Sequence, residues 1–219
     1  MAKSTLFYED NVFINCPFDR QYKPIFNAIV FAIHDAGFIA RCSLEVIDSG
    51  QNRLAKIISI IDECKYGIHD ISRTEVGGKT KLPRFNMPFE CGLFWGCFEY
   101  GGKRHKEKRT LVLDSKEYRY RTSLSDIAGQ DIQVHKNLAR IAIDKVRSWL
   151  NAGSGRTTVP GGKTIWDHYA LFHKELTPIL KGAGITRAEL DTPEYYPDYV
   201  TFIVDWLTEQ EAKAAEKKK

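Results

Sequence analysis

Glu90 is the residue whose type and surroundings point most directly to chemistry. Its chain neighbours, among them Phe89, Cys91, Leu93 and Phe94, are mostly apolar, and it falls in the first turn of a predicted helix. A carboxylate there has two explanations: it complements the helix dipole, or it is partly desolvated and faces a cleft. In a cleft it could attack a sugar carbon, or stabilise the oxocarbenium-like charge of glycosidic cleavage.

Two further carboxylates follow predicted strands. Asp70 either starts a turn or accepts hydrogen bonds from ribose hydroxyls. Asp19 either accepts such hydrogen bonds from the ribose or caps the helix that begins near Tyr22. His69 points away from Asp70, because successive strand residues face opposite sides of a sheet. His69 and His135 are therefore interpreted as packed histidines rather than catalytic bases.

The elements that must position these residues alternate along the first 150 residues. Short apolar runs predict strands over residues 12–15, 38–42, 66–69, 110–113 and 132–134. Apolar residues at helical spacing lie between them, and one helix is predicted to end at Gly37. Another is predicted to begin at Asn86, which can cap it, with Pro88 in its first turn and its end near Gly101.

This alternation is typical of an α/β protein with a doubly wound parallel sheet of about five strands. Ligands of such sheets bind outside the carboxyl ends of the strands, where the strand order reverses. Residues 15–19, 70–73 and 86–90 should meet there, so polar side chains far apart in sequence can face one cleft.

The domain organisation follows from composition. Residues 1–150 are expected to form the α/β domain, and the glycine- and proline-rich residues 151–163 a linker. Apolar residues at helical spacing predict a helical appendage over residues 164–211. Residues 212–219 contain only Ala, Glu and Lys and are expected to form a flexible tail.

Composition excludes several classes of function. The chain has 43% hydrophobic residues, 12% aromatic residues and a net charge of +4, which is ordinary for a soluble globular protein. The charge lacks the basic stripe of a nucleic-acid binder. The sequence has neither a membrane-length apolar run nor a signal-peptide pattern, so a cytoplasmic protein is expected.

Motifs and cysteines narrow the chemistry further. Phosphate loops of the GxGxxG and GxxxxGK types, zinc-binding HExxH and CxxC patterns, and a GxSxG elbow are all missing, and Gly77-Gly78 does not form a phosphate loop. We therefore expect neither a metal nor a cofactor. The odd count of five cysteines favours small buried residues in a reducing compartment, with a nucleophilic Cys16 as the minor alternative.

Three segments together resemble the nucleoside 2-deoxyribosyltransferase-like and TIR-like superfamily. They are FINCPFD at residues 13–19, IHDIS at 68–72 and FNMPFECG at 85–92. The resemblance covers roughly residues 8–150 and implies a flavodoxin-like sheet with a signature Glu early in the helix after the third strand. TIR domains proper carry a Ser-rich first loop and a Trp shortly before that Glu, and this sequence carries neither.

The resemblance implies roles for individual residues in cleaving the bond between a base and a (deoxy)ribose. Glu90 would be the nucleophile or charge stabiliser, and Asp70 would hold the sugar. The other implied contacts form the substrate-binding set: Phe18 would stack on the base, Asn15, Ser72 and Asn86 would supply hydrogen bonds, Arg73 or Arg84 would hold phosphate, and Pro17 and Asp19 would complete the loop.

Three functions remain open on the sequence. The first is hydrolysis or cyclisation of NAD by a homo-oligomer that releases nicotinamide, which the resemblance associates with bacterial anti-phage defence. The second is a nucleoside or nucleotide deoxyribosyltransferase or N-glycosidase. The third is a non-enzymatic module that binds a nucleotide signal or a TIR-like partner.

Overall fold

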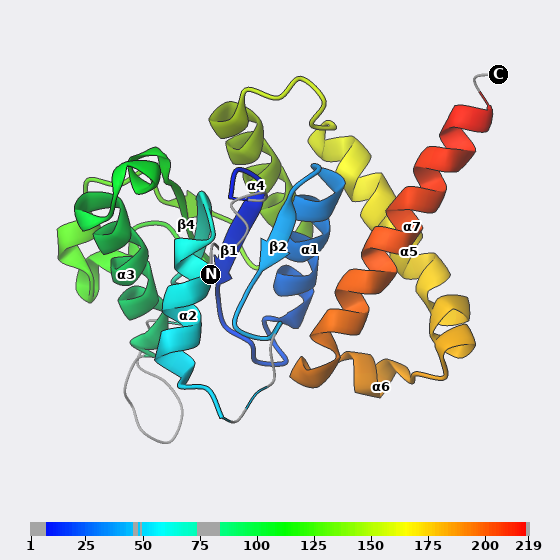
Figure 1. The fold of residues 1–219 in the computed structure, drawn as a ribbon, viewed down its shortest axis with the longest axis horizontal. Coiled ribbons are helices and arrows are strands. Elements are labelled where there is room, and N and C mark those ends of the chain that lie inside the picture. The colour runs from blue at the N-terminus through cyan, green and yellow to red at the C-terminus, as the bar shows by residue number, and fades with distance from the viewer. Residues whose placement is uncertain (1–7, 46–47, 49, 74–83, 218–219) are drawn as a thin grey trace.

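Five strands form one parallel sheet in the part of the chain that the computed structural model describes, residues 8–73 apart from 46, 47 and 49, and residues 84–217. The strand order is β2-β1-β3-β4-β5, and every neighbouring pair is parallel. The strands are β1 (Asn11–Asn15), β2 (Ile39–Arg41), β3 (Tyr66–Asp70), β4 (Arg109–Asp114) and β5 (Gln133–Val134). The predicted α/β fold is therefore confirmed (Figure 1).

Helices cover both faces of the sheet (Figure 1). α1 (Lys23–Asp35) and α4 (Ala139–Ser154) pack on one face, and α2 (Arg53–Asp62) and α3 (Asn86–Tyr100) on the other. The alternation within β1 explains this division, because Val12 and Ile14 join the core under α1 while Phe13 joins the core under α2 and α3. Among the described residues this region also contains the short 3-10 helices η2 (Lys103–Glu107), η3 (Arg119–Thr122) and η4 (Ser125–Ile127).

The strand order places a switch point between β1 and β3. From β1 the chain passes through α1 to β2 at the sheet edge, and then returns through α2 to β3 on the other side of β1. The connections after β1 and β3 therefore leave the sheet toward opposite faces. A crevice is expected at this point in doubly wound folds.

Local chemistry explains some of the helix ends. Gly37 has a φ of 79° and lies just beyond α1, where the left-handed conformation suits glycine. Asn52 caps α2 by accepting a hydrogen bond from the N–H of Ala55 at 3.1 Å. The predicted cap of α3 is wrong: Phe85 occupies the cap position in a helical conformation, so Asn86 is already the first helical residue and no side chain caps the helix.

The C-terminal helices extend the core instead of standing apart from it. They are α5 (Gly162–Ala183), α6 (Arg187–Leu190), the 3-10 helix η5 (Pro193–Tyr195) and α7 (Tyr196–Glu216). The Phe31 ring of α1 lies 5.4 Å from those of Tyr169 and Phe172 and 6.0 Å from that of Trp206. Side chains of α5 and α7 therefore belong to the same buried cluster as those of the sheet and α1.

The element boundaries near the C-terminus differ from the predicted ones. α4 continues through Ser154 and α5 begins at Gly162, so the connection is shorter than the predicted linker of residues 151–163. α7 continues through Glu216, into the predicted flexible tail, because alanine, glutamate and lysine are strong helix formers. Residues 218–219, and residues 74–83 with the Gly77-Gly78 pair of the predicted loop, lie outside the described residues.

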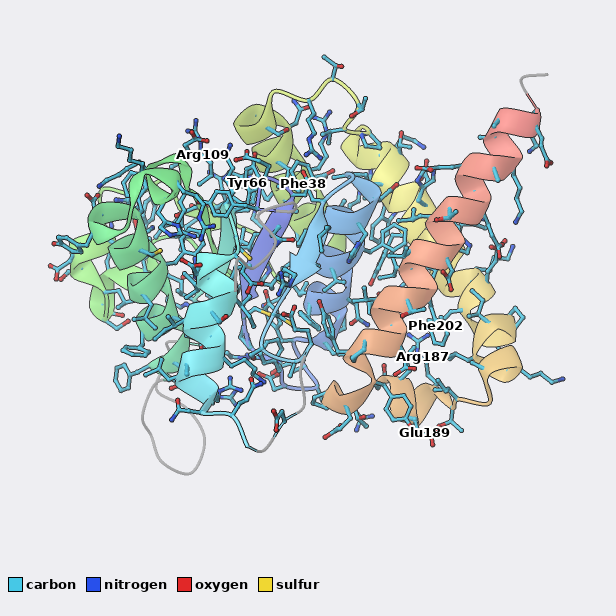
Figure 2. The ribbon with its side chains drawn as sticks, viewed as in Figure 1. Phe38, Tyr66, Arg109, Arg187, Glu189 and Phe202 are labelled. Carbon is cyan, nitrogen blue, oxygen red and sulfur yellow. The ribbon has the colours of Figure 1, made fainter. Side chains whose placement is uncertain are left out.

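Packed rings close the amino-terminal end of the strands. Phe38 and Tyr66 meet edge to face with their ring centroids 5.4 Å apart (Figure 2), and Trp149 lies 5.6 Å from Tyr66. The Arg156 guanidinium lies over Phe38, 4.2 Å from the ring centroid. These contacts fill the space between the amino-terminal ends of β2 and β3.

The five cysteines are free, and all except the partly exposed Cys97 are buried. This agrees with their interpretation as small core residues. No helix in the described part of the chain combines the length and apolar character needed to span a membrane.

Candidate active site

A cleft with a volume of about 640 Å³ opens at the carboxyl end of β1. Its walls come from the loop after β1, the start of α2 and the start of α3, which meet beside the switch point between β1 and β3. The lining residues are Asn15, Cys16, Pro17, Phe18, Asp19, Arg53, Arg84, Phe85, Asn86, Met87 and Glu90. Two of the three segments predicted to converge therefore do so.

Glu90 lines this cleft while only 8% of its surface is exposed. No hydrogen bond or ion pair joins its carboxylate to any other described residue. Burial raises the pKa of Glu90, and the nearby positive charge of Arg53 opposes that rise. The side chain is therefore a partly desolvated carboxylate with little charge compensation, which is a feature of functional sites.

The helix-dipole explanation of Glu90 is not supported by its position. α3 begins at Asn86, so Glu90 is its fifth residue, and its first turn contains no acidic residue. The favourable interaction of a carboxylate with a helix amino terminus falls off within that turn. The prediction that Glu90 lies in the first turn is wrong. Its actual position favours the other interpretation, a partly desolvated carboxylate that faces the cleft.

Asn15 ties the end of β1 to the start of α3. Its side-chain amide donates to the Met87 carbonyl at 2.7 Å and to Nδ1 of His69 at 3.1 Å. Both amide hydrogens are therefore used within the protein, and only Oδ1 is left for a substrate. The predicted substrate ligand Asn15 thus first holds α3, and with it Glu90, in position.

His69 is packed, as predicted, but only one of its ring nitrogens is hydrogen-bonded. Because Nδ1 accepts from Asn15, the proton of the neutral ring lies on Nε2, which has no hydrogen-bond partner among the described residues. The Phe94 ring lies 5.1 Å from the imidazole centroid. Burial, with a contribution from Lys108, lowers the pKa of His69 to about 3, so the ring stays neutral near pH 7.

Asp19, at the rim of the cleft, binds Arg73, which is one of the two arginines that were predicted to hold phosphate. Its carboxylate accepts from Arg73 at 3.1 and 3.2 Å and from the backbone of Tyr22 at 3.1 Å. Burial acts to raise the pKa of Asp19, but the hydrogen bonds and charge of Arg73 lower it overall. Arg84 is 59% exposed and lies 3.7 Å from the same carboxylate, so it is better placed than Arg73 to receive a substrate.

Asp70 does not line the cleft. The alternation of β3 sends His69 toward α3 and Asp70 toward the opposite face, where Asp70 is fully buried. Its carboxylate accepts from the Tyr22 hydroxyl at 2.6 Å and from the backbone N–H of Ser72 at 2.8 Å, and it lies 2.9 Å from Nε2 of His135. The predicted sugar-holding role of Asp70 requires correction, because no part of the side chain reaches the cleft.

His135 and Ser72 complete this buried network. The backbone N–H of Asn137 donates to Nδ1 of His135 at 3.0 Å, so the proton of the neutral imidazole lies on Nε2 and points to Asp70. Ser72 Oγ is buried 3.1 Å from the same Nε2. Ser72, which was predicted to bind substrate, therefore belongs to the protein interior, and His135 is the satisfied buried histidine that the sequence indicated.

Three other predicted contacts do lie at the cleft. Phe18 is half-buried, with its ring edge-on to Phe26 at a centroid distance of 5.3 Å. Asn86 is exposed, while Pro17 is buried beside Cys16. Burial raises the pKa of the Cys16 thiol far above its ordinary value, which disfavours the thiolate that a nucleophilic cysteine needs.

Arg53 is a charged lining residue of the cleft that the sequence did not predict. It is the first residue of α2, is exposed, and faces the cleft. The signal was available, because the loop after β2 must also reach the carboxyl edge of a parallel sheet, and Arg53 follows that loop. Phe85 and Met87 were missed as lining residues for a simpler reason: both were considered only as part of the segment at residues 85–92 that carries the resemblance.

The geometry thus gathers a desolvated carboxylate, the exposed Arg53 and Arg84, and exposed aromatic surface around a cleft whose volume is usual for small-molecule sites. Within the described residues, no three His, Cys, Asp or Glu side chains are grouped as metal ligands. Comparison of the chain with models of protein families, with curated proteins and with solved structures finds no match.

Proposed function

We propose that this chain cleaves the N-glycosidic bond of a nucleotide, with Glu90 as the catalytic carboxylate and NAD as the first candidate substrate. The observation that carries the proposal is the placement of Glu90: nine-tenths buried, without a partner among the described residues, and open to a cleft at the switch point of the sheet. A carboxylate in that state is available to a cationic transition state.

The chemistry needs only water as a second reactant. The C1′–N bond of NAD breaks and its electron pair goes to the pyridinium nitrogen, so nicotinamide leaves as a neutral molecule. The ribose carbon becomes oxocarbenium-like, and the negative charge of Glu90 stabilises it. Water then attacks C1′ and gives ADP-ribose and a proton. Attack by a nitrogen of the adenine would give a cyclic product instead.

The remaining cleft residues can bind the other parts of such a substrate. Arg53 and Arg84 present guanidinium groups that suit phosphate oxygens. Phe18 and Phe85 offer flat surfaces for a base. The volume of about 640 Å³ lies inside the usual range of small-molecule sites.

Product analysis by mass spectrometry tests the proposal. The wild-type chain and the Glu90→Gln variant are incubated with NAD and, separately, with mixed deoxynucleosides and free adenine. We expect nicotinamide and ADP-ribose or its cyclic form from the wild type alone. Base exchange without nicotinamide release would assign the deoxyribosyltransferase function instead. Binding of these compounds without turnover would assign the non-enzymatic function.

Arg53 gives a prediction about pH. Its positive charge lowers the pKa of Glu90, whereas burial raises it. The Arg53→Gln variant should therefore lose activity at a higher pH than the wild type when the solution is acidified. The measurement is the acid limb of kcat/KM against pH. Arg20→Gln, an exposed arginine that does not line the cleft, is the control and should leave the limb in place. An unchanged limb in Arg53→Gln would contradict the proposed coupling.

Self-association also belongs to the proposal, and an exposed apolar face supports it. Leu54 and Ile58 on α2, and Phe85 and Phe89 at the start of α3, are each between 41% and 61% exposed. Gly92 continues the line of Phe85 and Phe89 along α3, and a side chain placed there would meet only open space. Clustered exposed apolar side chains mark interaction surfaces, and this surface adjoins the proposed catalytic cleft.

Ile58→Glu should therefore weaken self-association, because a charge would be buried in the contact. Sedimentation velocity over a range of concentrations measures the effect. Val204→Glu on α7 is the matched control, since Val204 is similarly exposed at 42% but lies on another face. A wild type that remains monomeric at every concentration, with or without NAD, would reject this part of the proposal.

A further inference from the structure

The edge of β4 beside β5 is open over most of its length. β4 has six residues, whereas β5 has two and pairs only with Leu113 and Asp114. The four preceding residues of β4 therefore have no strand partner on that side among the described residues. Most proteins cover or block such an edge, because unpaired backbone groups recruit other strands.

The hydrogen-bond pattern shows which backbone groups are left over. The Arg109 N–H donates toward β3 and the Leu113 carbonyl accepts from the residue after β3, so the odd-numbered residues of β4 are bonded to β3. By alternation, the N–H groups of Thr110 and Val112 point to the open side. Neither has a hydrogen-bond partner in the described part of the chain, and Val112 is buried, where an unpaired donor is costly.

A groove runs along this edge. It consists of two hollows of about 660 and 520 Å³, which form one groove because they share lining residues. The shared residues are Gln130, Asp131, Gln133, Ile141 and Lys145. Trp95 of α3 and Trp149 of α4 line the hollow that contains the open edge, and both rings are partly exposed.

The charges of the groove favour a basic ligand. Asp131 and Asp144 both line it, and neither forms an ion pair with another described residue. The Lys145 ammonium donates to the Gln133 side chain at 2.9 Å, and the amide of Gln133 donates in turn to Asp131 at 2.8 Å. Glu117 and Lys136 also line the second hollow, so three carboxylates face two lysines along the groove.

We propose that this groove binds an extended peptide segment of a partner protein, which adds to the sheet as a strand beside residues 110–112. The unpaired N–H groups lie two residues apart, which matches the carbonyl spacing of an extended backbone. Trp95 and Trp149 supply large apolar surfaces for the peptide's side chains. A lysine or arginine of the peptide pairs with Asp131 or Asp144. The site lies on the β4–β5 edge and does not depend on the proposed glycosidase activity.

The test first selects peptides that bind the chain and then asks whether they bind in this groove. A library of random twelve-residue peptides displayed on phage is panned against the full chain, and the recovered peptides are synthesised and titrated by fluorescence anisotropy. We expect basic sequences whose affinity falls at least about tenfold in Asp131→Lys. Asp126→Lys, an exposed aspartate outside the groove, should change it by no more than about twofold.

Backbone amide resonances distinguish strand addition from other binding. The amides of Thr110 and Val112 should shift on peptide addition and exchange more slowly with solvent, while that of Leu111, already bonded toward β3, should change least. Recovery of no groove-dependent peptide, or equal binding to Asp131→Lys, would overturn the proposal. So would a concentration-dependent dimer abolished by Asp131→Lys, which would make a second copy of the chain the occupant.

Discussion

Glu90→Gln should lower kcat/KM for glycosidic cleavage by at least about 100-fold, on the scale seen when one electrostatic group of a preorganised site is removed. The substitution keeps the shape of the side chain and removes only the charge that faces the developing cation. Substrate binding should change much less than kcat/KM, because the contacts of the other cleft residues remain and only the attraction between Glu90 and the pyridinium charge is lost. Steady-state kinetics of nicotinamide release measures both quantities. Glu99→Gln, an exposed glutamate on the same helix, is the matched control.

The same substitution should not destabilise the fold. Because burial raises the folded-state pKa of Glu90, the folded chain keeps a proton there over a pH interval in which the unfolded chain has lost it. The contribution of this group to the free energy of unfolding is therefore present at low pH and is lost as the pH rises through the folded-state pKa. Urea unfolding at several pH values should show that the free energy of unfolding of Glu90→Gln lacks this pH dependence.

These measurements separate the proposed role from simpler ones. Activity should require the ionised carboxylate, so the acid limb of the wild-type profile should lie above the ordinary glutamate pKa of 4.5. Full activity in Glu90→Gln would remove the catalytic role altogether. Loss of activity together with a lower free energy of unfolding would instead indicate a structural role for the carboxylate.

Asp70→Ala should lower the free energy of unfolding by about 3–5 kcal/mol, the usual cost of removing one partner from a buried charged network. The Tyr22 hydroxyl, the Ser72 N–H and His135 Nε2 would each lose the acceptor that they now share. Tyr22→Phe removes only one donor and should cost less, about 1.5–3 kcal/mol. Urea denaturation measures both, with exposed Asp126→Ala as a control expected within about 0.5 kcal/mol of the wild type.

This experiment also tests the correction of the sequence-based role of Asp70. A residue that holds the sugar would raise KM when replaced by asparagine, while the chain kept its stability. Replacing a residue of the buried network should instead lower the free energy of unfolding and leave KM unchanged. The fraction of the variant that remains folded should bind substrate normally. A stable Asp70→Asn variant with a raised KM would restore the original interpretation.

The sheet and its helices could be predicted because their signals are local. Runs such as Val12 to Asn15, and the helical spacing from Ile25 to Ile33, specify buried strands and helices by their own periodicity. The place of the cleft also followed, since parallel strands collect their carboxyl ends at one edge. The cap of α3 failed because its geometry depends on how the chain enters the helix at Phe85.

The composition of the site could be predicted only in part, because it depends on which face of the sheet each residue serves. Asp70 and His69 are adjacent in sequence, yet one joins Tyr22 and the other Asn15 on opposite sides of β3. The alternation of strand residues predicted the packing of His69, and the same alternation places Asp70 on the opposite face of the sheet, which the predicted sugar-holding role overlooked. Arg53 was missed because the rule about carboxyl ends was applied to the segments after the first and third strands and not to the loop after β2, which α2 follows.

The shared core beneath α5 and α7 limits how the molecule can move. A lid over a cleft must swing away from its support, but Phe172, Tyr199 and Trp206 are buried in the same cluster as Phe31. Exposing side chains of this kind costs about 1.5–3 kcal/mol each. The C-terminal helices therefore stay fixed against α1. Any movement that opens or closes the cleft has to come from the short segments at its own rim.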